Sequence, residues 1–63
     1  MSIREALQQY INEEITAIEL IRLLTGVFDP DNALELMALI NQVCRHEEGD
    51  IPTVEFKKIY DLD

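Results

Sequence analysis

Cys44 and His46 are the residues of this chain with the most reactive side chains, since a thiol and an imidazole can act as nucleophile and base. The chain contains one cysteine and one histidine. On one helix, residues two apart point about 200° away from each other, so this pair cannot share the hydrogen bond that activation needs. A zinc site would need carboxylates or a second chain to complete its ligands. We therefore expect Cys44 to pack inside, His46 to lie on the surface near a helix end, and no metal to bind.

A second motif, over residues 49–56, resembles the second half of a calcium-binding EF-hand loop. With Gly49 at the sixth position of the loop, Glu55 falls at the twelfth, where the loop carries its bidentate carboxylate. The first and third positions then become Cys44 and His46, where oxygen ligands are required. A glycine that ends one helix, a buried isoleucine and an apolar residue that opens the next helix explain the same segment, and we expect no calcium site.

Adjacent carboxylates at Glu13-Glu14 and Glu47-Glu48 could in principle serve acid–base chemistry. Both pairs fall in expected connectors, where water keeps carboxyl groups ionised. The chain has no glycine-rich phosphate loop and is short for enclosing a substrate pocket. We expect no catalytic residue, no cofactor and no enzymatic activity.

The charge balance is the strongest compositional signal. Thirteen acidic and five basic residues give a net charge of −8, which argues against direct nucleic-acid binding because phosphate contacts need clustered Lys and Arg. The N-terminus has no basic leader followed by an apolar run, and Glu19 and Arg22 interrupt the most apolar window. We expect a cytoplasmic protein without a membrane span, and the lone cysteine suits a reducing compartment.

Helical periodicity runs through the whole chain and predicts a single all-α domain over residues 1–63. The expected elements form a compact array of four helices at about 3–11, 17–25, 30–46 and 53–61. Capping-box pairs occur at Ser2 with Glu5 and at Thr16 with Glu19. The periodicity also continues across the intervening turn, so one helix over residues 3–25 is the alternative to two.

The stretch 33–44 is the expected central helix, because its apolar residues cover most of its circumference. Gly26 is expected to end the preceding helix, and Asp29 with Pro30 to begin this one. Thr53 is expected to cap the last helix.

The helices carry more apolar surface than so small a bundle easily hides. We expect Leu23, Leu34 and Leu39 to lie at the margins of the apolar stripes, where they either complete the core or form an interaction surface. The preferred hypothesis is a protein-interaction or regulatory module that acts by docking, as a homodimer or with another protein. The alternative is an acidic inhibitor or nucleic-acid mimic that blocks a basic enzyme or DNA-binding protein.

Overall fold

The computed structural model describes residues 2–63, which form a small all-α fold and confirm the predicted class. A 3₁₀ turn, η1, leads directly into the third of four helices. The elements are α1 (Ile3–Ile11), α2 (Ala17–Val27), η1 (Pro30–Asn32), α3 (Ala33–Glu48) and α4 (Thr53–Tyr60). Within residues 2–63, no helix combines the length and the apolar character needed to cross a membrane.

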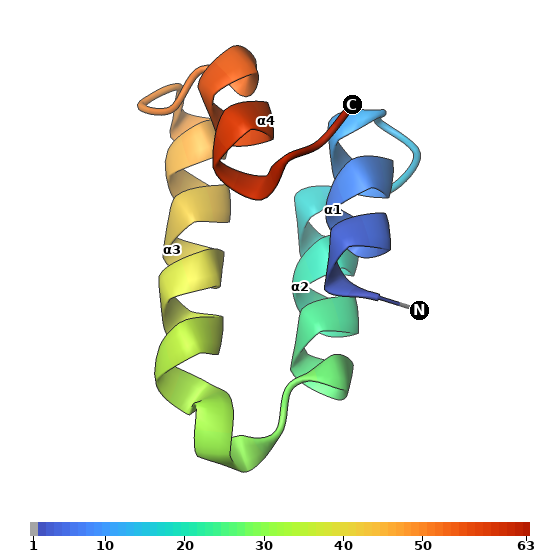
Figure 1. The fold of residues 1–63 in the computed structure, drawn as a ribbon, viewed down its shortest axis with the longest axis vertical. Helices are drawn as coiled ribbons and strands as arrows, with labels where there is room; N and C mark the ends of the chain where they lie inside the picture. The colour runs from blue at the N-terminus through green and yellow to red at the C-terminus, as the bar shows by residue number, and fades with distance from the viewer. Residues whose placement is uncertain (1) are drawn as a thin grey trace.

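The helices form two layers. α2 and α3 run antiparallel as a hairpin, and α1 and α4 lie on one side of that hairpin (Figure 1). Packing contacts join α2 to both α1 and α3, and join α1 to α4. α1 and α2 therefore each pack against two other helices, whereas α3 packs mainly against α2.

Local capping separates α1 from α2 and decides between the two predicted arrangements of residues 3–25. The Ser2 hydroxyl accepts a hydrogen bond from the Glu5 amide at 3.1 Å, and the Thr16 hydroxyl accepts one from the Glu19 amide at 3.2 Å. Glu13 adopts a positive φ of 63° in the intervening turn. Each cap satisfies an amide that has no acceptor inside its own helix, so both helix starts are fixed locally.

The end of α2 differs from the prediction at Gly26. This residue lies inside the helix, which continues to Val27 and is capped by the extended Phe28. By contrast, Gly49 ends α3 with a φ of 90°, as predicted. The helix therefore ends at the apolar Val27, where the extended backbone of Phe28 begins, and not at the glycine.

Replacing Gly26 with alanine should stabilise the protein. A Cβ at this position meets nothing within 4 Å, and alanine is favoured over glycine inside a helix by roughly 0.5–1 kcal/mol. Chemical denaturation followed by circular dichroism should show this gain. Gly49→Ala is the matched control and should lower stability by about 1 kcal/mol, because its left-handed backbone disfavours any side chain. Equal effects at both glycines would contradict the two assigned conformations.

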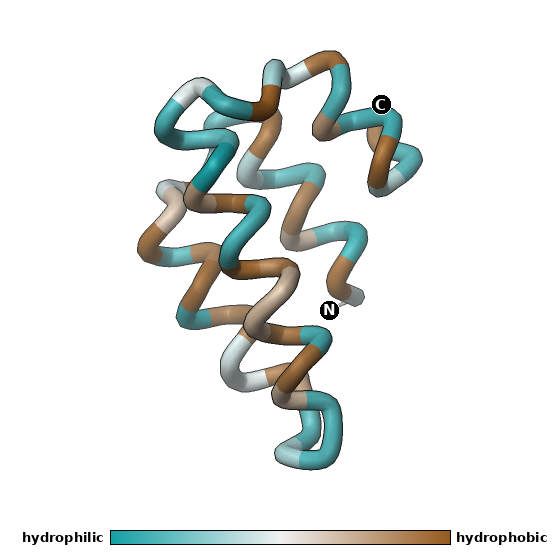
Figure 2. The backbone as a smooth tube through the Cα atoms, turned by 90° about the vertical axis from the view of Figure 1, so that its left-hand side faces the viewer, coloured by the Kyte–Doolittle hydropathy of each residue, from teal (hydrophilic) through white to brown (hydrophobic). Residues whose placement is uncertain are grey.

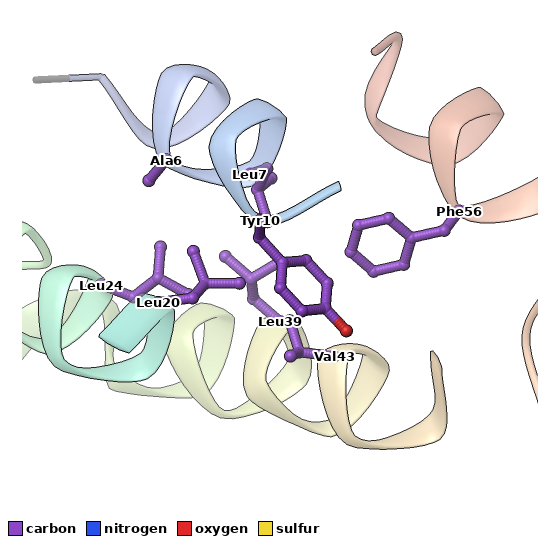
Figure 3. Packing of buried hydrophobic residues seen from close by; sticks show 8 residues of the cluster. All are labelled: Ala6, Leu7, Tyr10, Leu20, Leu24, Leu39, Val43 and Phe56. Carbon is purple, nitrogen blue, oxygen red and sulfur yellow. The ribbon is translucent and has the colours of Figure 1, made fainter. Parts of the chain in front are cut away.

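Eight apolar residues form the core, between α1 and α4 on one side and α2 and α3 on the other (Figure 3). They are Ala6, Leu7, Tyr10, Leu20, Leu24, Leu39, Val43 and Phe56. In α3 only Leu39 and Val43 are buried, while Met37 is 65% exposed. The prediction that Cys44 packs inside was wrong, since its thiol is exposed. Because the other helices pack against one side of α3, only one stripe of its broad apolar surface is buried.

Candidate functional site

The outer side of the α2–α3 hairpin is the first candidate site. In α3, the Gln42 and His46 side chains turn toward the other layer, where they bond to Tyr60 of α4 and Tyr10 of α1. Ile40 and Cys44 each precede one of these residues by two positions and therefore point about 200° away from it. Ile40 is half-buried and Cys44 is exposed. This side of α3 thus faces away from α1 and α4.

α2 presents a similar apolar side. Glu19 lines a cleft beside Tyr10 of α1, and Ile21, two residues later, points about 200° away from Glu19. Ile21 is half-buried, and Ile18, one turn earlier, is 67% exposed. In an antiparallel hairpin, the sides that turn away from the second layer lie next to each other.

These residues make one apolar face, which we define as Ile18, Ile21, Met37 and Ile40. Val27 and Ala33 flank the connection, so helical rise places Ile40 approximately level with Leu20 and Ile21, and Met37 about one turn closer to the connection. Apolar positions recur along the length of α3 in Figure 2, which turns this helix toward the viewer. Ile18 and Met37 leave about two thirds of their surface in water, and exposed apolar residues that adjoin one another are typical of an interaction site.

The three leucines expected at the stripe margins have three different environments. Leu39 is 7% exposed and belongs to the core, and Leu23 is half-buried against that core. Leu34 is 82% exposed, one turn of α3 before Met37. Of the three, Leu34 alone is fully exposed on the surface of the chain, whereas Leu39 completes the core.

The second candidate site is a polar cluster that joins α3 to α1 and α4, on the side of the hairpin that faces these two helices. The Tyr10 hydroxyl lies 2.6 Å from His46 Nδ1 and donates to Glu47 Oε1 at 2.9 Å. His46 Nε2 lies 2.9 Å from the Thr53 hydroxyl. All four groups are satisfied when Nδ1 carries the imidazole proton and Nε2 accepts from Thr53. His46, expected on the surface, is half-buried and connects three helices.

This cluster lines an open cleft of about 450 Å³ at the α1–α2 turn. Tyr10, Ile11, Ile15, Thr16, Ala17, His46 and Thr53 line it together with Glu13, Glu14, Glu19 and Glu47. Glu13 and Glu14 of the first predicted carboxylate pair and Glu47 of the second therefore line one cleft, although the two pairs are far apart in sequence. The glutamates give the cleft a negative potential. Both ring nitrogens of His46 already form hydrogen bonds to side chains of other helices.

Comparison of the chain with protein-family models, with curated proteins and with solved structures finds no match in any of the three. Its function must therefore be argued from the two sites themselves.

The EF-hand-like segment does not form a calcium loop. Cys44, His46 and Glu48 all belong to α3, where successive side chains diverge around the helix instead of converging on an ion. Thr53 was predicted to cap α4, but it is the first residue of that helix, after Pro52, and its hydroxyl bonds to His46 instead. Helical backbone and a tertiary hydrogen bond account for this segment.

The two tyrosines should resist ionisation while the protein is folded. Burial, and then the hydrogen bond and negative charge of Glu47, raise the pKa of Tyr10, and burial raises the pKa of Tyr60. A raised pKa favours the folded state below the ordinary value of about 10, and this stability is lost as the pH rises further.

Absorbance of tyrosinate should therefore appear together with loss of the helical circular-dichroism signal, at a pH above 10. Tyr10→Phe should remove one tyrosinate from the final signal. A tyrosine that ionises near pH 10 with full helicity retained would contradict the burial of that ring.

Sequence reasoning missed the polar cluster because its contacts are non-local. Tyr10 and His46 are 36 residues apart, and Tyr10 is spaced along its helix like an ordinary core residue. A signal for the apolar face was present in the sequence, namely the wide apolar arcs of residues 17–25 and 33–44. Those arcs did not show which side would remain uncovered.

Proposed function

We propose that this protein is a docking module whose apolar face binds an amphipathic helix of a partner protein, without catalysis. The exposure of Ile18 and Met37 on adjacent helices carries this proposal. Two antiparallel helices leave a shallow groove between them, and a third helix packs into such a groove through its apolar stripe. Burying a large apolar side chain contributes roughly 1.5–3 kcal/mol, which gives this face a substantial binding capacity.

The small size of the fold supports the same proposal. Eight residues make the core of a 63-residue chain, and domains of this length have thin stability margins. A ligand that binds only the folded state adds to that margin. Docking on the apolar face would therefore stabilise the protein as well as occupy the face.

The alternative of an acidic inhibitor has less support from the distribution of charge. Four glutamates line the cleft at the α1–α2 turn, but Asp29 and Asp31 lie at the opposite end of α2, in its connection to α3. A mimic of nucleic acid would be expected to gather its carboxylates on one surface. The apolar face is the more distinctive feature, and we base the proposed function on it.

Titration with a synthetic amphipathic helix tests docking directly. The peptide carries a leucine stripe at helical spacing and glutamine on both flanks, so that only apolar packing is measured. Backbone amide NMR shifts should change at Ile18, Ile21, Met37 and Ile40. Met37→Glu should weaken binding by at least about tenfold, because a charge would replace buried apolar surface.

Val54→Glu is the matched control, since Val54 is 67% exposed on α4, in the other layer. This variant should bind the peptide like the unmodified chain, and circular dichroism should show that both variants stay folded. Absence of binding, or equal weakening by the two substitutions, would overturn the proposal. Light scattering of the chain alone identifies any pairing of two copies through the same face.

A further inference from the structure

We infer that the helix bound by the apolar face carries acidic side chains along both of its flanks, an inference that rests on the proposed docking function. The face has arginine at each outer edge, on a chain that is otherwise strongly acidic. Arg22 lies on α2, one turn after Ile18, and Arg45 lies on α3, two turns after Met37. Both arginines are exposed.

The positions of these two arginines distinguish them from the remaining basic residues. The Arg4 guanidinium donates two hydrogen bonds to the carbonyl oxygen of Asp61, at 2.7 and 3.1 Å. Lys57 and Lys58 belong to α4, in the other layer. Arg22 and Arg45 are therefore the basic residues of the hairpin itself, one on each helix.

Their spacing fits a helix that lies along the groove. Counting equal numbers of residues from Val27 and Ala33 along the two antiparallel helices places Arg22 opposite Ala38. Arg45 lies about 10 Å farther along the α3 axis. Long arginine side chains can bend over the apolar face and keep their guanidinium groups at its edge. A helix in the groove would thus meet one arginine on each flank, about two turns apart.

Carboxylates are the groups that match this pattern, because guanidinium and carboxylate form charge-assisted, bidentate hydrogen bonds. The net charge of −8 opposes an acidic partner at long range. At physiological salt, however, the screening length is about 8 Å, so the arginines at the edges act on a bound helix more strongly than the cleft glutamates at the α1–α2 turn, which lie on the side of the hairpin that faces α1.

A second copy of this chain matches the face less well. Any two-fold pairing of two such faces brings the same arginine-edged surface against itself. The like charges then approach each other around the apolar centre, which disfavours that pairing. The charge pattern therefore favours a different protein over a homodimer.

Three peptides with the same leucine stripe test the inference, with glutamate, glutamine or lysine on both flanks. At physiological salt, where the net charge of the chain is screened, the glutamate peptide should bind the unmodified chain about tenfold more tightly than the lysine peptide, since two edge pairs form in one complex and two repulsions in the other. Added salt should reduce this difference. The double variant Arg22→Glu/Arg45→Glu should reverse the preference and favour the lysine peptide.

Lys57→Glu/Lys58→Glu is the matched control, because it makes the same change in net charge on α4. It should leave glutamate preferred over lysine. Equal affinity for the three peptides, or reversal by the control as well, would overturn the acidic-flank inference while docking itself stands. Failure of all three peptides to bind would instead overturn the docking function. Dimers in which the face is buried against a second copy would also contradict the inference.

Discussion

Leu39→Asp should unfold the protein rather than only separate it from a partner. Leu39 is 7% exposed and packs in the core formed by all four helices. Loss of its burial alone costs about 2–5 kcal/mol, and an unpaired carboxylate in an apolar site adds a further penalty. A domain of this length has a total stability of about 3–9 kcal/mol. Circular dichroism at neutral pH should therefore show little helix and no cooperative melting transition.

Leu34→Asp provides the matched control on the same helix. Leu34 is 82% exposed in the first turn of α3, where a negative charge is favoured by the helix dipole. The monomer should therefore keep its stability to within about 0.5 kcal/mol, as is usual for a surface substitution. A folded Leu39→Asp protein, or a Leu34→Asp protein that unfolds equally, would contradict the assigned orientation of α3.

Phe56→Ala should have a comparably large effect, through the junction of α1, α3 and α4. The Phe56 ring is fully buried and its centroid lies 5.9 Å from that of Tyr10, 5.0 Å from that of His46 and 5.0 Å from that of Tyr60. Removing a buried phenylalanine costs about 3–5 kcal/mol. Urea denaturation should show a stability loss of this size, or no folded baseline.

Ile59→Ala tests whether the effect belongs to the position of Phe56 or to α4 as a whole. Ile59 lies on the same helix and is 48% exposed, so its truncation should cost about 1 kcal/mol or less. The tyrosine fluorescence of the two variants gives a second readout, because Phe56 contacts both tyrosine rings. Similar losses in the two variants would mean that α4 docks without a specific anchor.

Much of the fold could be predicted because its determinants are local. Ser2 and Thr16 begin α1 and α2 through hydrogen bonds three residues away, and Gly49 ends α3 through its own backbone preference. Gly26 was the local exception. Its permissive backbone fits a helix interior as well as a helix end, and the chain continued in helix to Val27.

The candidate site was less predictable because it depends on contacts between distant segments. Thr53 had the sequence context of a helix cap, but its hydroxyl bonds to His46 of another helix. Cys44 and Met37 fell on an apolar stripe that predicted burial, and both are exposed. A periodic pattern identifies the apolar side of a helix, but it does not count how many neighbours are present to cover that side.

The sequence by itself determined that the chain is all-α, where most of its helices begin and end, and that its surface is acidic, since propensity, capping and charge act within a few residues. The tertiary structure alone decided which part of each apolar arc became core. Leu39 is 7% exposed and Met37 is 65% exposed on the same helix. Their side chains point about 200° apart, and α1 and α4 pack on one side of the hairpin only. The other side became the apolar face because none of the helices described over residues 2–63 packs on it.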